Sequence, residues 1–318
     1  MRKLLILFLL LFYFKSSFLY PQDTVKGGFT KCITYEYSYQ SGILDTNSKR
    51  LLNFRKYNNN GNMVKYHYFN TIVYDTSWVD EFYTYNSFGK LIEIYHDEPL
   101  DSTEWKSILN YDSSGNLIEK IHYKPLNNPV WKKLYKYNTH GQKIEEEEYY
   151  KPLDSIKLKK TYKYNHIGKL IEETEINGWG DPKITYTYDE FNRLIEEIHC
   201  FYNGTKIERH IHKYDSIGNE IESRRIEQRG AEFIYSLQYD SKRNLIKWIE
   251  IDPGMFCYNF QNRTYDENGK LLSLSDPNQK AIWKYDKFGN IIEYIEERIE
   301  NNEFKPRTKT IYIYSNED

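Results

Sequence analysis

The chain repeats one short pattern of apolar and polar positions. Aromatic residues two positions apart, such as Tyr135 and Tyr137, lead into a short polar stretch. A pair of aliphatic residues follows, and then a run in which Glu and Ile are mixed, as in "LIEKIHY" at 117–123. Aromatic and β-branched residues at a spacing of two are typical of β-strands. Each repeat therefore predicts a strand, a tight turn and a second strand.

The turn has a fixed composition. Ten tyrosines open it, about 25 residues apart, and Asp or Asn follows every one of them: Tyr57, Tyr85, Tyr111, Tyr137, Tyr164, Tyr188, Tyr214, Tyr239, Tyr265 and Tyr285. The fourth residue after the tyrosine is glycine in eight repeats: Gly61, Gly89, Gly115, Gly141, Gly168, Gly218, Gly269 and Gly289. Asn192 and Arg243 occupy the same position in the other two. We expect the Asp or Asn to cap a type I turn and the glycine to form a left-handed bulge, a conformation that Asn192 also tolerates.

The fold class follows from these units. Several connections between them carry proline, as in "KPLNN" at 124–128, and proline stops a strand from extending. No segment has convincing helical spacing. We predict an all-β fold of about ten tandem antiparallel β-hairpins of about 25 residues, stacked into a long twisted or curled sheet. Residues 57–318 form this repeat domain, and residues 23–56 match the repeat poorly and are expected to cap its first edge.

The first residues predict export. Arg2 and Lys3 precede an apolar run at 4–14, which is shorter than the roughly 20 residues of a membrane-spanning helix but suits a secretory signal. We expect residues 1–22 to be a signal peptide. The mature chain is then secreted or held in the periplasm or cell envelope, with no membrane span of its own.

Composition narrows the function classes. Charge is nearly balanced, with 44 basic and 46 acidic residues, so nucleic acid is not an expected partner. The 32 tyrosines, 16 phenylalanines and 6 tryptophans indicate a folded chain. The chain has only three cysteines, Cys32, Cys200 and Cys257, which are too few for a disulfide framework. One disulfide between two of them is compatible with the sequence, which does not indicate the pair. No nucleophile motif, phosphate-binding loop or zinc signature is present, so we expect no enzyme activity and no cofactor.

The repeats resemble a known family. The segments "KYDSIGNEI" (213–221), "TYDENGKLL" (264–272) and "KYDKFGNII" (284–292) are similar to YD repeats, the tyrosine–aspartate repeats of Rhs-type proteins, and the likeness covers about residues 57–314. In large members, such hairpins wind into a hollow shell around a toxin segment. For this chain the resemblance implies a short exported strip without the toxin or core region. A weaker likeness to MORN-type repeats lacks most of the glycines of those units.

Acidic residues recur eight positions after the opening tyrosine, at Glu93, Glu119, Glu145, Glu172, Glu196, Glu222 and Glu293. Hairpins stacked in register would align them into a column. Such a column can bind cations or a basic partner. Lysines of the preceding strands, such as Lys136 and Lys163, can also neutralise it, and like charges on adjacent strands favour that solution. We expect a solvated face of paired charges.

Histidines suggest one metal hypothesis. His210 and His212 lie two apart on a predicted strand with Glu208 in line, a spacing that can hold a metal. Chance explains short motifs of this kind more often, and no metal is predicted. His96, His122 and His199 share one repeat position with Glu148 and Arg225, which indicates a surface position.

Tryptophans give the binding hypothesis. Trp105 and Trp131 each precede an opening tyrosine by six residues, and Trp78 lies near the equivalent place. We expect them to stack in neighbouring repeats, either as packing or as an exposed row that a glycan or protein ligand contacts. Glycan binding is also associated with YD-type repeats. The predicted function is a cell-envelope or extracellular binding module, and the alternative is an accessory component of an Rhs-like toxin or secretion system. Gene neighbours that encode toxin or secretion parts would favour the alternative.

Overall fold

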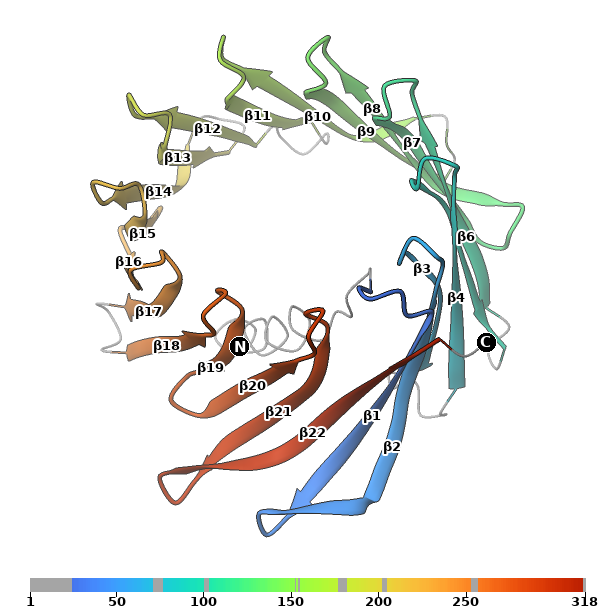
Figure 1. The fold of residues 1–318 in the computed structure, drawn as a ribbon. Helices are drawn as coiled ribbons and strands as arrows, with labels where there is room; N and C mark the ends of the chain where they lie inside the picture. The colour runs from blue at the N-terminus through green and yellow to red at the C-terminus, as the bar shows by residue number, and fades with distance from the viewer. Residues whose placement is uncertain are drawn as a thin grey trace.

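The computed structural model describes residues 25–316 except 71–76, 100–102, 152, 154, 177–181, 202–204 and 253–256 (Figure 1). The predicted signal peptide lies outside the described residues. All regular structure in the described part of the chain is β-strand, in 22 strands. No helix there is long and apolar enough to cross a membrane.

The first eleven strands are β1 (Lys31–Gln40), β2 (Ile43–Tyr57), β3 (Met63–Asn70), β4 (Ser77–Tyr85), β5 (Leu91–Glu98), β6 (Thr103–Tyr111), β7 (Leu117–Tyr123), β8 (Pro129–Tyr137), β9 (Lys143–Tyr150), β10 (Ile156–Tyr164) and β11 (Leu170–Ile176). The other eleven are β12 (Lys183–Tyr188), β13 (Leu194–Cys200), β14 (Lys206–Tyr214), β15 (Glu220–Glu227), β16 (Glu232–Tyr239), β17 (Leu245–Asp252), β18 (Cys257–Tyr265), β19 (Leu271–Ser275), β20 (Gln279–Tyr285), β21 (Ile291–Glu300) and β22 (Glu303–Ser315).

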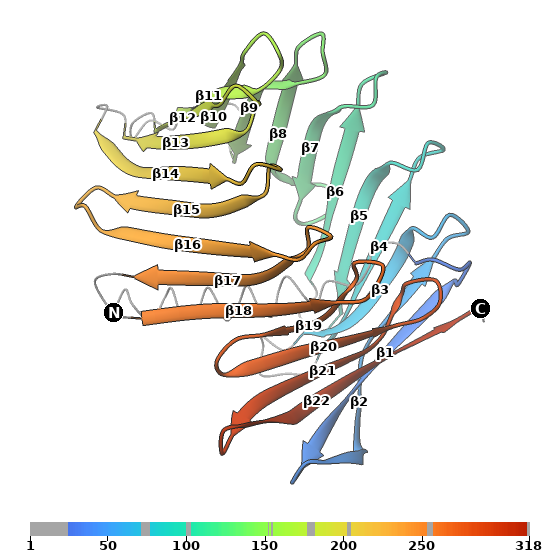
Figure 2. The same cartoon turned by 60° about the vertical axis from the view of Figure 1, so that its left-hand side comes forward.

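The strands form a closed barrel. Each pairs antiparallel with the strands before and after it, and β22 pairs with β1, so that the strands follow one another around a ring in chain order (Figures 1 and 2). The predicted all-β hairpin architecture is confirmed. The expected long sheet with free edges is wrong, because a twisted sheet of this width curls and closure pairs the backbone groups that its edges would leave exposed.

The tight turns show why the repeat needs its composition. In the turn after Tyr111, the Gly115 N–H donates to the Asp112 carbonyl at 3.0 Å, and the Asp112 carboxylate accepts the Asn116 N–H at 2.8 Å. Gly115 has φ +83°, in the left-handed region that favours glycine. Asn192, at φ +61°, adopts the same conformation. Arg243 also does so at φ +68°, and its Nε donates to Asn219 Oδ1 of the preceding repeat at 2.8 Å.

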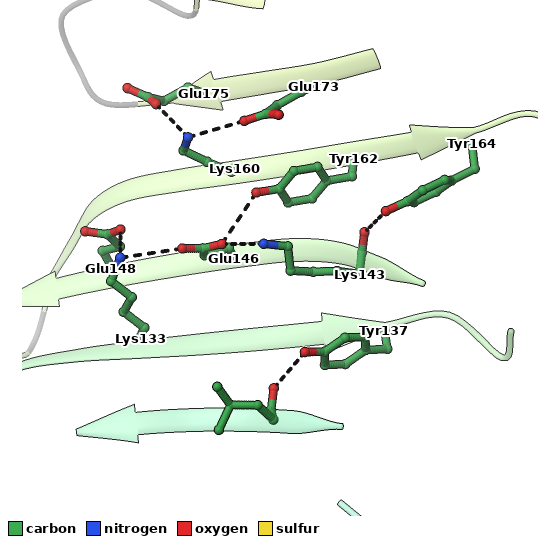
Figure 3. Close-up of polar contacts among 11 residues, drawn as sticks. Lys133, Tyr137, Lys143, Glu146, Glu148, Lys160, Tyr162, Tyr164, Glu173 and Glu175 are labelled. Carbon is green, nitrogen blue, oxygen red and sulfur yellow. Dashed lines mark hydrogen bonds and ion pairs between the residues drawn. The ribbon is translucent and has the colours of Figure 1, made fainter. Parts of the chain in front are cut away.

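Eight of the ten opening tyrosines join their hairpin to the one before it through the phenol hydroxyl. The Tyr137 hydroxyl donates to the Leu117 carbonyl at 2.9 Å, and the Tyr164 hydroxyl donates to the Lys143 carbonyl at 2.7 Å (Figure 3). The same bond is made by Tyr85, Tyr111, Tyr188, Tyr214, Tyr265 and Tyr285. Because the acceptor is always a backbone carbonyl, the bond does not depend on the neighbouring side chains. A single side chain type thereby locks successive repeats together.

The two ends of the chain close the barrel. Strands β22 and β1 pair from Lys31↔Ser315 to Ser38↔Thr308. The Tyr314 hydroxyl donates to the Ile291 carbonyl at 2.9 Å, the bond that the opening tyrosines make elsewhere. The β22–β1 pair therefore resembles the other repeats in its pairing and its tyrosine bond, but no tight turn joins its two strands. The segment expected to cap a free edge supplies β1 and most of β2, and the described part of the chain has no free edge there. The division of the chain at residue 57 stays a prediction.

Apolar packing is concentrated around this closure. Val25, Cys32, Tyr57 and Met63 are buried together, and Tyr66, Tyr83, Tyr312 and Tyr314 pack against them. A second buried group combines Leu274, Ala281 and Trp283. Among the described residues, these are the clusters that form a hydrophobic core. The rest of the barrel is held by strand pairing, tyrosine hydroxyls and charge pairs.

Candidate functional site

Successive residues of each strand alternate between an inner and an outer face. The segment that begins at Val25 lies inside the ring (Figure 1), and it packs with Tyr57 and Met63, so these residues point inward. Tyr83 packs against the same cluster, and Glu81, two residues earlier, shares its face. Residues directly opposite on paired strands also share a face. The register therefore places side chains around the whole barrel on one face or the other.

A row of four rings crosses the inner face over β5 to β8. Glu81 is opposite His96, and His96 is opposite Trp105. On the next pair, His122 is opposite Trp131. The ring centroids of His96 and Trp105 are 4.7 Å apart, those of Trp105 and His122 are 5.0 Å apart, and those of His122 and Trp131 are 5.2 Å apart. We call these four residues the His–Trp row.

Hydrogen bonds orient the two imidazoles of the row. His96 is buried, and its Nδ1 lies 3.5 Å from the Glu81 carboxylate. His122 is half-buried, and its Nδ1 lies 3.1 Å from the Ser107 hydroxyl. Burial, together with the charges of Lys120 and Lys124, lowers the pKa of His122. His122 is therefore neutral at pH 7, and its flat ring stacks on Trp131 without a charge of its own.

The sequence predicted part of this row. Trp105 and Trp131 lie on one face in neighbouring repeats, but the two rings do not stack on each other, because His122 lies between them. Trp78 does not join them, because it lies on the outer face and stacks on His67 at 4.2 Å. The expectation that the His96 and His122 position is a surface position is wrong, since it points inward and His96 is only 8% exposed. The sequence analysis did not pair these histidines with the tryptophans. On the adjacent strands, His96 lies directly opposite Trp105 and His122 lies directly opposite Trp131.

The wall beside the row carries a charge network (Figure 3). Lys133 pairs with Glu148 and lies 3.6 Å from Glu146. Glu146 also forms an ion pair with Lys143 at 2.6 Å. Burial raises the pKa of the Glu146 carboxyl, but the lysines outweigh burial and the pKa is lowered. Further along the wall, Lys160 contacts Glu173 at 3.2 Å and Glu175 at 3.3 Å. The inner face is thus polar and hydrogen-bonded around the four rings.

His210 and His212 lie on the inner face of the opposite wall, on β14. His210 is paired with Glu208, and its ring lies 5.3 Å from that of His199. His212 Nδ1 is 2.6 Å from the Glu220 carboxylate, a hydrogen bond that raises the pKa of this histidine. Each histidine is thus held by its own carboxylate. Among the described residues, no group of three or more His, Cys, Asp or Glu side chains is arranged to hold a metal ion.

The glutamate column lies on the outer face. Glu145 is held between Lys136 and Lys159, the second at 2.6 Å, and Glu172 is held between Lys163 at 2.7 Å and Lys183. Glu293 is held between Lys284 and Lys309 in the same way, whereas Glu222 contacts Lys213 on β14 and Arg224 on its own strand. Hydrogen bonds from the two lysines lower the pKa of Glu145. At Glu145, Glu172 and Glu293, the column is therefore paired with basic side chains on the neighbouring strands of both sides.

Cys32 and Cys200 are free thiols. Cys32 is fully buried, and burial raises the pKa of its thiol. These two cysteines therefore form no disulfide with each other.

Comparisons with known proteins leave the family open. No family model matches the chain, and no curated protein matches it. Solved structures that match include a TcdB2–TccC3–Cdc42 complex, at 13% identity and a TM-score of 0.45, with coverage of 90% of this chain and 19% of that one. A porin-like protein from Bacteroides uniformis matches at 11% identity and a TM-score of 0.35, with coverage of 91% and 98%. The chain spans about a fifth of the first of these. Similarities at these TM-scores do not establish a shared fold, and the resemblance to YD repeats is not confirmed by a family match.

Proposed function

We propose that this protein is a non-enzymatic binding protein and that the His–Trp row is its ligand-contacting surface. The observation that supports the proposal most strongly is the continuity of the row, which runs over four strands on one face. Trp105, His122 and Trp131 are half-buried, so part of each ring is in contact with solvent. Partly exposed aromatic surface of this kind commonly marks a site of interaction.

Carbohydrate is the ligand class that suits the row best. A sugar ring presents a flat apolar face of C–H groups and a rim of hydroxyls. Aromatic side chains provide the apolar partner, and polar groups at their edges fix the orientation of the ligand. Here the edges carry Ser107, Glu81 and the imidazole nitrogens of His96 and His122. The alternation of Trp and His supplies both kinds of contact along one line.

A glycan-array screen of the purified protein, followed by calorimetric titration of the best ligand, tests the proposal. We expect Trp105→Ala and Trp131→Ala each to weaken binding about fivefold or more, because central aromatic contacts commonly contribute more than about 1 kcal/mol. Trp78→Ala is the matched control, since it removes a tryptophan from the outer face of the same wall. It should leave affinity unchanged.

Two results would count against the proposal. One is an array with no bound glycan. The other is a ligand whose affinity is the same in both inner-face variants, or falls equally in Trp78→Ala. Unfolding midpoints measured for each variant separate a loss of contact from a loss of fold.

The cellular setting is part of the proposal and is tested separately. Amino-terminal sequencing of the protein recovered from the medium or the cell envelope should begin close to residue 22. Recovery of the uncut chain in the cytoplasm would contradict export. The alternative role, as an accessory component of an Rhs-like toxin or secretion system, stays a prediction.

A further inference from the structure

Lys120 differs from the other lysines on its wall of the inner face. Lys133, Lys143 and Lys160 each form an ion pair with one or two glutamates. Lys120 forms no ion pair with any residue that the structure describes. Its Nζ instead lies 5.6 Å from the centre of the Trp131 ring, within the His–Trp row.

A second lysine faces Lys120 directly. Strands β7 and β8 pair Lys120 with Lys133, so two ammonium groups occupy opposite positions on one face. Like charges in such positions destabilise a sheet. Burial and the charge of Lys133 both lower the pKa of Lys120. Lys133 is neutralised by Glu148, which leaves the charge of Lys120 as the uncompensated one.

We propose that the site takes an acidic glycan, with the carboxylate of a uronic acid bound by Lys120 while the sugar ring packs against the exposed part of Trp131. The inference rests on the proposed function and specifies its ligand class. The geometry carries it, because the Lys120 ammonium lies 5.6 Å from the centre of the Trp131 ring, so that one acidic sugar can contact both side chains. A single charge and the neutral His122 suit a monovalent carboxylate. The ion pair also offsets the repulsion between Lys120 and Lys133.

Matched oligosaccharides test the ligand class. Hexagalacturonate and its carboxyl-reduced counterpart have the same length and linkage and differ in the carboxylates. At pH 7.5 we expect the wild-type protein to bind the acidic form at least tenfold more tightly, which is the size of effect that a hydrogen bond to a charged group gives. Lys120→Met should remove this preference without weakening the neutral form. Lys120→Arg should retain most of it.

Lys106→Met is the matched control. Lys106 lies on the adjacent strand, and its Nζ is 5.4 Å from the centre of the Tyr123 ring, but both residues are on the outer face. This variant should bind both oligosaccharides as the wild type does. Raising the salt concentration should weaken the acidic complex of the wild type and of Lys106→Met, but have little effect on Lys120→Met.

The outcomes separate this inference from the proposed function. Equal binding of the two oligosaccharides, or a preference for the acidic form that survives in Lys120→Met, overturns the acidic-glycan inference. The proposed binding function is then still tested separately by the tryptophan variants. Equal binding of a sulfated oligosaccharide of the same length overturns the choice of carboxylate. If neither hexasaccharide binds, the inference fails, and the proposed function fails with it only when the array is also silent.

Discussion

Removing one opening hydroxyl tests how the repeats are held together. In Tyr137→Phe the ring stays in place, and the hydrogen bond from the hydroxyl to the Leu117 carbonyl, 2.9 Å long in the wild type, is lost. An intramolecular hydrogen bond contributes about 1 kcal/mol to stability, and the half-buried carbonyl loses its partner. We therefore expect the free energy of unfolding to fall by about 1 kcal/mol. For a chain of this size, that lowers the melting temperature by about 2 °C.

The effect should repeat around the ring. Tyr111→Phe removes the equivalent bond to the Leu91 carbonyl at 2.7 Å, so its cost should be similar. The hydroxyls sit on different hairpins and share no partner, so the double variant should lose about 2 kcal/mol. Tyr123→Phe is the control, because Tyr123 lies on the outer face and its hydroxyl has no hydrogen bond among those the structure gives.

The assay is urea unfolding followed by far-ultraviolet circular dichroism. A shift of the midpoint at constant slope reports the change in stability. If Tyr137→Phe and Tyr123→Phe unfold at the same urea concentration as the wild type, the hydroxyl bonds do not hold successive repeats together. The tyrosine that opens each repeat would then need another explanation, such as ring packing alone.

Three further outcomes follow from the structure. The lysine partners hold the folded-state pKa of Glu145 below its ordinary value of 4.5, so its stabilising contribution is complete above that pH and is lost as the pH falls through the lowered pKa. Unfolding midpoints measured between pH 7 and pH 3 should therefore decrease as the pH passes through that lowered pKa. Glu145→Gln should reduce this loss of stability by about 1 kcal/mol or less, because solvent screens exposed ion pairs. Midpoints that do not change with pH would contradict the charge pairing of the glutamate column. Gly115→Ala should cost about 1 kcal/mol at φ +83°, measured by thermal melting. By the same measurement, Asn192→Gly should be neutral or slightly stabilising, and a stability loss as large as that of Gly115→Ala would refute the backbone argument.

Local features of the fold could be predicted from the sequence because they depend on residues close together in the chain. The Asp112–Gly115 turn is specified within four residues, and so are the strands on either side of it. Closure was not predictable, because the pairing of Lys31 with Ser315 depends on the twist accumulated over every intervening strand. No local residue pattern encodes that sum.

The candidate site was predictable only in part for the same reason. The equal spacing of Trp105 and Trp131 from their tyrosines placed them on one face. The tight turn sets the face of His96 and His122, but their placement opposite Trp105 and Trp131 depends on the register across the looser connections, whose lengths vary along the chain. The outer position of Trp78 follows from a one-residue difference in spacing, since it lies seven residues before Tyr85. A single residue reverses the face in a strand.

Closure of the barrel by β22 and β1 is the claim on which the inner face depends, and a disulfide tests it directly. Ile33 and Ile313 are opposite each other on these strands, on the outer face, and paired strand positions lie about 5.5 Å apart between Cα atoms, within disulfide range. In a background in which Cys200 and Cys257 are both replaced by Ser, the double variant Ile33→Cys and Ile313→Cys should oxidise to one intramolecular cross-link, identified by mass spectrometry of the linked peptides. The control pair is Ile33→Cys and Ile221→Cys, which places one cysteine on β1 and the other on β15 in the opposite wall. These two cysteines should stay reduced. An uncross-linked monomer from the first pair, or cross-links only between molecules, would contradict the closed barrel.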